Sequence, residues 1–410
     1  MLKLITNNLI IYGSTNLIKS FIPFLLLPIL TTYLSQTEFG ILSLIEVAIL
    51  FLFPIISLNI KGAINVEFFN LGLKELKYFI TNSLSLTFLV FISISVIFFS
   101  FSSNIEQITG IPQNIIIFLP VFSFLRVNSQ VLLGIFQISQ NPKKYALFTI
   151  IQSLFDFLLT YILVVIYHQN YWGRLGGIYI SFFVSSIIAL IYLYKFDYLT
   201  LPVFKYTKNI LKFGIPLIPH AVGGTIIAMS DRFFISYYYS YNDVGIYSVA
   251  YQVSSIMLLF GMSLNQGWVP IFYKLLKSKT DIKIILKYII YLSFFILTTF
   301  LLIFIFRNFI FNLFINEKFY ISKDYFLLLL FGFLFQSLYF LITNFIFYFK
   351  KTIYLAIITC SCALINILLN FILIQTYGVK GVAIATFITW GLFLLIIIIS
   401  TYFLLENENY

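Results

Sequence analysis

Ionisable side chains within long apolar stretches are the residues of this sequence best suited to chemistry. Such a residue at bilayer depth costs ~2.5 to 3.5 kcal/mol on insertion scales, so it normally faces protein or a water-filled cavity. Six residues fit this description: Lys19, Glu46, Arg126, Asp156, Asp231 and Arg232. Three cations and three anions are more charge than helix packing requires, so we expect some of them to line a cavity.

A structural explanation of the same residues is that they form ion pairs between neighbouring helices. Arg126 would then pair with Asp156, and Glu46 with Asp231 or Arg232. Both explanations keep the charges away from lipid, and the sequence leaves the choice between them open.

The composition shows why bilayer depth is relevant. The chain has 410 residues, of which 61% are hydrophobic and 10% charged. That much apolar surface cannot be buried in one soluble core, so the bilayer must act as solvent. The net charge of +11 does not indicate a nucleic-acid partner, because the basic residues lie in short connections rather than in an RNA-binding motif.

Twelve apolar stretches are long enough to cross ~30 Å of hydrocarbon as helices. They cover about residues 10–34, 39–60, 78–101, 115–138, 145–167, 175–194, 213–238, 244–266, 284–306, 325–349, 353–374 and 380–404. No soluble domain remains, so the fold class is an all-α integral membrane protein. Pro216 and Pro219 predict a bend near the start of the seventh stretch.

The distribution of basic residues predicts the orientation. An even number of spans puts both termini on one side, and lysines are concentrated on that side. The opposite connections carry only Arg174, Arg307, Lys318, Lys323 and Lys380. Because positive connections are retained inside, both termini should be cytoplasmic. The basic connections 195–212 and 267–283 serve as retention signals or as a collar for anionic lipid head groups.

Short motifs recur in the two halves of the chain. Glu38–Ser43 resembles Asp243–Ser248, and Ser57–Asn59 resembles Ser263–Asn265. We therefore predict an amino-terminal lobe over residues 1–200 and a carboxyl-terminal lobe over residues 201–410. Each half has six spans, so the two have parallel topology, and we expect the lobes to face each other across a central cavity.

The repeat also distinguishes the lobes by charge. Adding 210 to the positions of Arg126 and Asp156 gives Gln336 and Asn366, which are neutral. This offset predicts that charge-dependent events belong to the amino-terminal lobe.

The sequence gives no sign of a catalytic or metal centre. Cys360 and Cys362 are two apart on one expected helix and so point to different faces. We expect no catalytic residues, no metal and no bound cofactor.

Several segments resemble a known family. They are Pro28–Leu30 through Gly40, Ser230–Arg232 followed by Val244–Ala250, and Asn366–Ile374 followed by Tyr377–Thr386. The chain is similar along nearly its whole length to bacterial O-antigen or capsule repeat-unit flippases. These belong to the polysaccharide transporter family, in a superfamily with the multidrug and toxic-compound extruders and the peptidoglycan lipid flippases.

The resemblance implies a MATE-like fold in the inner membrane and a role in polysaccharide or lipopolysaccharide biosynthesis. The implied activity is transfer of undecaprenyl-pyrophosphate-linked oligosaccharide from the cytoplasmic to the periplasmic leaflet, coupled to a proton or sodium gradient. Membrane lipids and other polysaccharide assembly proteins are the implied partners.

The charged residues suit this activity, because a pyrophosphate that crosses hydrocarbon needs cations to replace its water. Arginine grips phosphate bidentately and lysine acts as a point charge. The candidate substrate-binding cations are Lys19, Lys61, Arg126 and Arg232, and the candidates for ion coupling or charge pairing are Glu46, Asp156 and Asp231.

Two other functions stay open at this point. A drug or cation antiporter of the same fold would favour an acidic cavity, which Lys19 and Arg126 argue against. A membrane-embedded polysaccharide polymerase or acyltransferase would need a large outer loop or a catalytic constellation, and the longest outer loop, about residues 307–324, offers neither.

Overall fold

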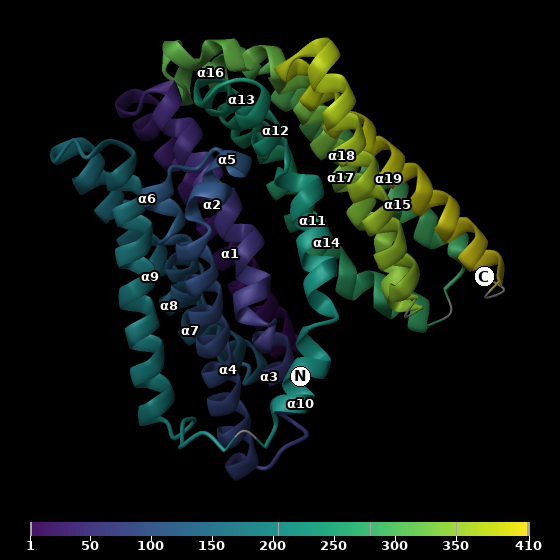
Figure 1. Ribbon diagram of the computed structural model, residues 1–410. Helices are drawn as coiled ribbons and strands as arrows, with labels where there is room; N and C mark the ends of the chain where they lie inside the picture. Colours follow the sequence, from purple (N-terminus) through teal and green to yellow (C-terminus); the bar gives the residue numbers. More distant parts are fainter. Residues whose placement is uncertain (1, 204, 279, 350, 408–410) are drawn as a thin grey trace. The chain divides into compact units, whose positions relative to one another are not determined.

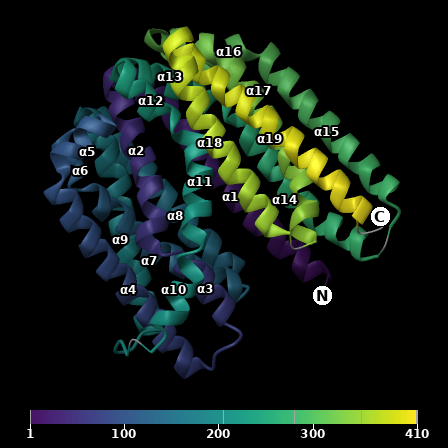
Figure 2. The ribbon, with the colours of Figure 1, turned by 45° about the vertical axis from the view of Figure 1, so that its right-hand side comes forward.

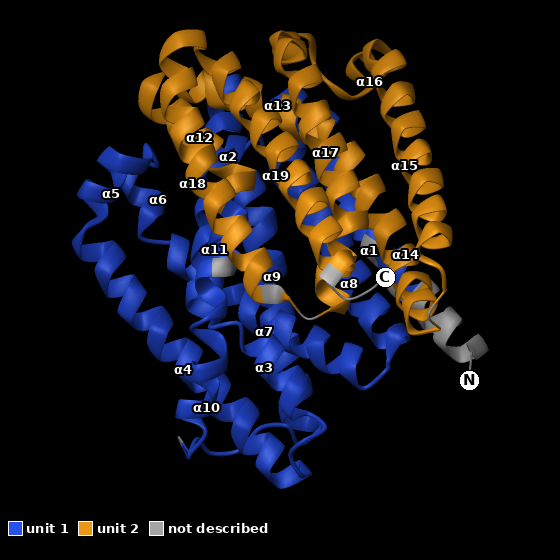
Figure 3. Cartoon of the chain, turned by 90° about the vertical axis from the view of Figure 1, so that its right-hand side faces the viewer, with its two compact units in different colours: residues 1–225 blue, residues 226–410 orange. Residues whose placement is uncertain are grey.

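The structure is a computed structural model of the chain. It describes residues 2–203, 205–278, 280–349 and 351–407, and for 2–10, 12, 16, 220, 352 and 407 only the backbone. Helices account for the secondary structure of all these residues, with no strand among them (Figure 1). The chain divides into two compact units, residues 1–225 (unit 1) and 226–410 (unit 2) (Figure 3).

The helices of unit 1 are α1 Leu2–Tyr33, α2 Gln36–Ser57, α3 Ile60–Glu67, α4 Leu73–Ser100, α5 Ser102–Thr109, α6 Gln113–Ile116, α7 Leu119–Ile138, α8 Pro142–Tyr161, the π-helix η1 Ile162–Ile166, α9 Asn170–Lys195 and α10 Thr207–Gly214. Helix α11, Leu217–Met229, runs from unit 1 into unit 2. Unit 2 continues with α12 Asp231–Tyr238, α13 Tyr241–Ser254, α14 Ile256–Lys277, α15 Ile282–Ile305, α16 Arg307–Phe314, the 3₁₀ helix η2 Glu317–Ser322, α17 Lys323–Tyr348, α18 Thr352–Tyr377 and α19 Val379–Asn407.

The twelve expected spans are confirmed. Within the described residues, 12 helical segments are long and apolar enough to cross a membrane, and each matches one of the predicted stretches. Many of their large apolar side chains are exposed, among them Phe88, Val96, Phe294 and Leu395. Exposed apolar surface on this scale is what lipid covers. The chain is a multi-pass membrane protein.

The repeated motif has a local structural role, because it begins a helix in each half. Ser35 caps α2, and its hydroxyl and backbone N–H both meet Glu38 in a capping box. The Ser240 hydroxyl accepts a hydrogen bond from the backbone N–H of Asp243 at the start of α13. A side chain that satisfies a free N–H at a helix start stabilises it by ~1 kcal/mol. The serine and acidic residue therefore determine where the second span of each half begins.

Within each unit the fourth span is the centre of the packing. In unit 1 it includes α7, which packs against α2, α3, α4, α8 and α9 (Figure 1). In unit 2 it is α17, which packs against α13, α14, α15, α18 and α19 (Figure 2). Apart from the short helix α3, these partners belong to the second, third, fifth and sixth spans in both cases, which supports the internal repeat. Arg126 lies on α7, so its neighbours come from several helices of unit 1.

The seventh span is broken where the prolines predict a bend. Helix α10 ends at Gly214 and α11 begins at Leu217, with Pro216 between them. Proline has no N–H to donate, which favours a helix end at this point. The compact units divide within α11, whereas the predicted lobe boundary at residue 200 came from the sequence repeat and stays a prediction.

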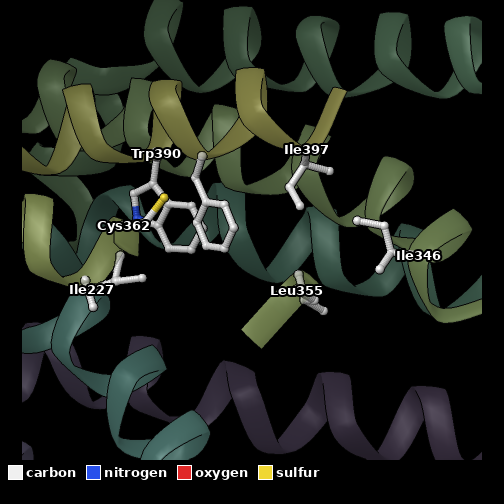
Figure 4. Close-up of a cluster of buried hydrophobic side chains, with 8 residues drawn as sticks. Ile227, Ile346, Leu355, Cys362, Trp390 and Ile397 are labelled. Atoms are coloured by element: carbon white, nitrogen blue, oxygen red, sulfur yellow. The ribbon is translucent and has the colours of Figure 1, made fainter. Parts of the chain in front are cut away.

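A cluster of buried apolar side chains joins four helices of unit 2 (Figure 4). Ile227 from the end of α11 packs with Ile346 of α17, Cys362 of α18, and Trp390 and Ile397 of α19. Cys362 is buried here while Cys360 is exposed, so the two thiols face different surroundings as expected. The cluster fixes the end of α11 within unit 2.

Candidate functional site

Three of the four predicted substrate-binding cations gather in unit 1. Lys19 of α1 and Lys61 of α3 lie within electrostatic range of each other, and Arg126 of α7 lies within range of Lys19. None of the three has an ion pair among the described residues. Like charges that repel without a partner destabilise the fold, so this arrangement favours an anion that is not part of the chain.

The surroundings of Arg126 contain further unsatisfied donors. Its guanidinium lies 4.8 Å from the centre of the Phe182 ring, and its Nε is buried without a hydrogen-bond partner. The Tyr179 hydroxyl, within electrostatic range of Arg126, is also buried without a partner. A buried unsatisfied donor costs about 1 to 3 kcal/mol. The guanidinium with its free Nε and the nearby Tyr179 hydroxyl can together bind an acceptor-rich anion.

Asp156 has a different partner from the one expected. Its Oδ1 accepts a hydrogen bond from Arg174 Nη1 at 2.8 Å, and the same nitrogen donates to Thr160 Oγ1 at 2.9 Å. Arg126 is only within electrostatic range of Asp156. The proposed ion pair between Arg126 and Asp156 is therefore wrong, because helix packing brings Arg174 to Asp156 instead. This leaves the charge of Arg126 uncompensated at close range.

Arg174 was placed in a connection by the sequence, and the structure corrects this. Helix α9 begins at Asn170, so Arg174 lies in its second turn and is 8% exposed. Arginine close to a predicted span end looks like a topology signal. Only the contact with Asp156 in the structure shows that it is half of a partly buried ion pair.

Unit 2 contains a second charged centre, at Asp231, which is fully buried. Its carboxylate accepts hydrogen bonds from Asn370 Nδ2 at 3.0 Å, Thr386 Oγ1 at 2.7 Å and the Tyr247 hydroxyl. These partners lie on α18, α19 and α13, while Asp231 begins α12. Four helices therefore converge on one carboxylate.

Neutral oxygens extend this centre. Asn366 Oδ1 accepts from Ser230 Oγ at 3.2 Å and from Asn370 Nδ2 at 3.1 Å, and Asn366 Nδ2 donates to Thr389 Oγ1 at 3.2 Å. Asn370 Oδ1 is buried and has no hydrogen-bond partner. An unsatisfied acceptor beside a buried carboxylate can coordinate a hard cation such as sodium, which prefers oxygen ligands. Asn366, expected to be a plain neutral counterpart of Asp156, thus belongs to a charged centre.

Arg232 is enclosed by the aromatic side chains of the same unit. Its guanidinium lies 4.2 Å from the ring centre of Tyr251 and 6.0 Å from that of Tyr247, and the residue is 4% exposed. A desolvated cation–π contact contributes about 2 kcal/mol. These contacts favour a structural role beside Asp231, and its predicted contact with substrate stays a prediction.

Glu46 is half-buried on α2 and lies within electrostatic range of Arg126 and Tyr179. No described carboxylate forms an ion pair with Arg126, so Glu46 tempers the positive charge without neutralising it by contact. The predicted pairing of Glu46 with Asp231 or Arg232 joins residues of different units and stays a prediction.

The sequence missed the polar residues that complete both centres. Tyr179 was not singled out, and Tyr247, Asn370 and Thr386 were noticed only as parts of the repeated and family motifs. An available signal was the spacing of Asn366 and Asn370, since residues four apart share one helix face. No group of three or more His, Cys, Asp or Glu that could hold a metal ion occurs in the part of the chain that the structure describes.

The fold is similar to that of solved helical membrane proteins. A solved structure described as the inward-facing conformation of a multidrug resistance MATE family transporter of the MOP superfamily has a TM-score of 0.76 at 14% identity, over 96% of this chain and 94% of that one. A second, the lipid II flippase MurJ in its inward closed conformation, has a TM-score of 0.66 at 16% identity, over 96% and 87%. At these identities the likeness shows a MATE-like fold, as expected.

The sequence comparisons identify the family. The model described as "Polysaccharide biosynthesis protein" matches residues 5–276, and the MatE model matches residues 216–372. The chain belongs to the polysaccharide biosynthesis protein family. A relative from Haemophilus influenzae named "Lsg locus putative protein 1" is 25% identical over 83% of this chain and 84% of its own length. An uncharacterized membrane protein of the same organism is also 25% identical, over 63% and 62%.

Proposed function

We propose that this protein is a flippase that moves an undecaprenyl-pyrophosphate-linked oligosaccharide, an O-antigen or capsule repeat unit, from the cytoplasmic to the periplasmic leaflet. It acts by alternating access in the inner membrane, with both termini in the cytoplasm, alongside other polysaccharide assembly proteins. The family supplies the link to polysaccharide, and the charges of unit 1 supply the link to an anionic carrier.

The observation that carries the proposal is the group of unpaired cations Lys19, Lys61 and Arg126. A pyrophosphate loses its hydration on entering a low-dielectric region and needs positive charge in its place. Arg126 can donate two parallel hydrogen bonds to phosphate oxygens, and the lysines add point charges. The same anion would satisfy the free Arg126 Nε and Tyr179 hydroxyl.

In this proposal, the Asp231 centre couples transport to the ion gradient. A carboxylate among amide and hydroxyl oxygens can exchange a proton or a sodium ion, and each changes the charge of a fully buried site. Such a change alters the hydrogen bonds that hold α12, α13, α18 and α19 together. Ion binding would in this way favour one packing of unit 2 over another.

The test is complementation of a strain that lacks the gene. Changing Lys19 or Arg126 to Ala should abolish surface polysaccharide and outer-leaflet lipid-linked sugar, while Arg126→Lys retains some because the charge survives without the fork. Lys143→Ala is the control, since Lys143 is exposed and has no ion pair among the described residues. Full export by normally abundant Arg126→Ala would refute the proposed role.

Orientation is tested separately with reporter fusions. A fusion that ends near Lys277 should report cytoplasm, and one that ends near Glu317 should report periplasm. The reverse pattern would overturn the proposed direction of transport.

A further inference from the structure

A pocket in unit 1 lies beside the break between α2 and α3. Its volume is about 250 Å³, and its polar lining comes from Ser57, Asn59, Lys61 and Gln130. Leu58 and Asn59 form the break, with φ of 47° and 50° in the left-handed region. Asparagine tolerates this region better than most residues. The break turns Asn59 and Lys61 towards the same small space.

Two of the polar groups that line this pocket are donors without a hydrogen-bond partner among the described residues. Asn59 Nδ2 is buried without a hydrogen bond, and Lys61 has no hydrogen bond or ion pair with any described residue. Burial lowers the pKa of Lys61 from its ordinary value, which indicates that the ammonium group is poorly solvated where it lies. A half-buried lysine with no partner is an energetic cost to the fold unless an anion is bound.

Close packing holds Lys61 at the pocket. An added Cβ on Gly134 of α7 would lie 2.9 Å from Lys61 Cγ and 3.1 Å from Asn65 Oδ1, so only glycine lets the lysine stem lie against this helix. The position of Lys61 at the pocket therefore depends on Gly134, an uncharged residue.

The pocket also lies at the bend of the seventh span. A Cβ on Gly214, the last residue of α10, would lie 2.1 Å from the Leu58 carbonyl oxygen, so α10 ends directly on the α2–α3 break. Leu217, the first residue of α11, lines the pocket. One wall thus belongs to the helix that continues into unit 2. A ligand here would contact both the α2–α3 break and the helix that joins the units.

We propose that this pocket binds a phosphate-bearing group, and that it is the loading site at which the pyrophosphate of the lipid-linked substrate first docks. The loading role rests on the proposed flippase function, whereas phosphate binding rests on the geometry of the pocket alone. Lys61 supplies the charge, and Asn59 Nδ2 and the Gln130 amide supply directed hydrogen bonds. Lys61 is within electrostatic range of Lys19, which is itself within range of Arg126. A phosphate group bound at Lys61 would therefore have two further cations of unit 1 near it.

Binding to the purified full-length protein in detergent tests the site without any need for transport. The probes are inorganic pyrophosphate, farnesyl pyrophosphate, and mixed micelles that contain phosphatidylglycerol or phosphatidylcholine. Each is assayed by titration calorimetry and by the shift of the melting temperature. Wild-type protein should bind both pyrophosphates and be stabilised by them.

Three variants remove different parts of the site. Lys61→Met keeps the apolar stem and should weaken pyrophosphate binding about tenfold or more. Asn59→Gly keeps the left-handed backbone and should cost about threefold. Gly134→Ala should weaken binding by displacing Lys61 with no change of charge. Lys74→Met is the matched control, because Lys74 is exposed and does not line the pocket.

The melting temperature without ligand separates a binding role from a structural one. Lys61→Met should melt at the wild-type temperature or above it, since the variant removes an unpaired half-buried charge. Wild-type binding should weaken as the pH rises through the lowered pKa of Lys61, because the ammonium group loses its proton, while Lys61→Arg should bind equally over that range.

Each contrary result has a definite meaning. Unchanged pyrophosphate binding by Lys61→Met, or an equal loss in Lys74→Met, would overturn the phosphate site. If only phosphatidylglycerol binds in a Lys61-dependent way, the pocket is a lipid head-group site and its role in loading substrate is overturned. Normal surface polysaccharide in a strain without the gene would instead refute the flippase function and leave the binding result intact.

Discussion

The charged centres of the two units are built in opposite ways. In unit 2 the Asp231 carboxylate has three hydrogen-bond donors from three other helices, and Arg232 lies against Tyr251. In unit 1 Lys19, Lys61 and Arg126 have no ion pair among the described residues. The carboxylate of unit 2 is satisfied by hydrogen bonds, whereas the cations of unit 1 have no carboxylate in contact among the described residues.

The paired charges of unit 2 should contribute mainly to the stability of the fold, and the unpaired charges of unit 1 mainly to ligand binding. A buried charge with partners holds helices together, and removal of one partner is costly because the other is left unsatisfied. An unpaired charge contributes no such contact. Its removal should therefore change the stability of the fold little but weaken the binding of an anion strongly. The same kind of residue at bilayer depth should therefore give opposite phenotypes in the two units.

The largest effect on stability is expected at the Asp231 centre. Asp231→Ala should destabilise the protein by ~3 to 5 kcal/mol, because Tyr247 and Thr386 lose their acceptor and Asn370 loses one of its two. Arg232 also loses the carboxylate next to it in the chain. Asp231→Asn should lose less, since its amide oxygen still accepts hydrogen bonds. The melting temperatures of both variants are measured on detergent-purified protein, with size-exclusion chromatography as the readout. Wild-type melting of Asp231→Ala would mean that the two centres do not differ.

An intermediate effect is expected at the pair in unit 1 that is satisfied. Arg174→Gln should cost ~1 to 3 kcal/mol, less than at Asp231, because the Asp156 side chain is 21% exposed and partly screened by solvent. The double variant with Asp156→Asn should recover much of the stability that Arg174→Gln loses. Arg126→Gln offers the contrast, since Asp156→Asn should not improve its export. Recovery of Arg126→Gln by Asp156→Asn would show that Arg126 is the true partner.

The smallest effect on stability, and the largest on export, is expected for the unpaired cations. Lys19→Gln should keep membrane abundance and melting temperature within about 0.5 kcal/mol of wild type, in the range of substitutions that break no contact. Arg126→Gln should lose only the cation–π contact with the Phe182 ring in addition. Quantitative immunoblotting and outer-leaflet lipid-linked sugar are measured in the same cells. A loss of export that is matched by an equal loss of protein would place these cations in the fold rather than in binding.

Much of the fold could be predicted from the sequence because its causes are local. A span forms wherever about twenty apolar residues must satisfy their own backbone hydrogen bonds in lipid, and each of the twelve did so. The starts of α2 and α13 follow from Ser35 with Glu38 and Ser240 with Asp243, which interact over three residues. The six intramembrane charges were visible for the same reason, since each contrasts with its own apolar stretch.

The partners of those charges were decided only by the tertiary structure. Asp231 meets Asn370 and Thr386 from 139 and 155 residues away, and Asp156 meets Arg174 rather than Arg126. Which side chains meet depends on the depth and rotation of each packed helix, and a shift of one residue turns a side chain by ~100° around the helix axis. Sequence alone therefore shows which residues carry charge in the membrane, and helix packing determines which charges are satisfied and which are left for a ligand.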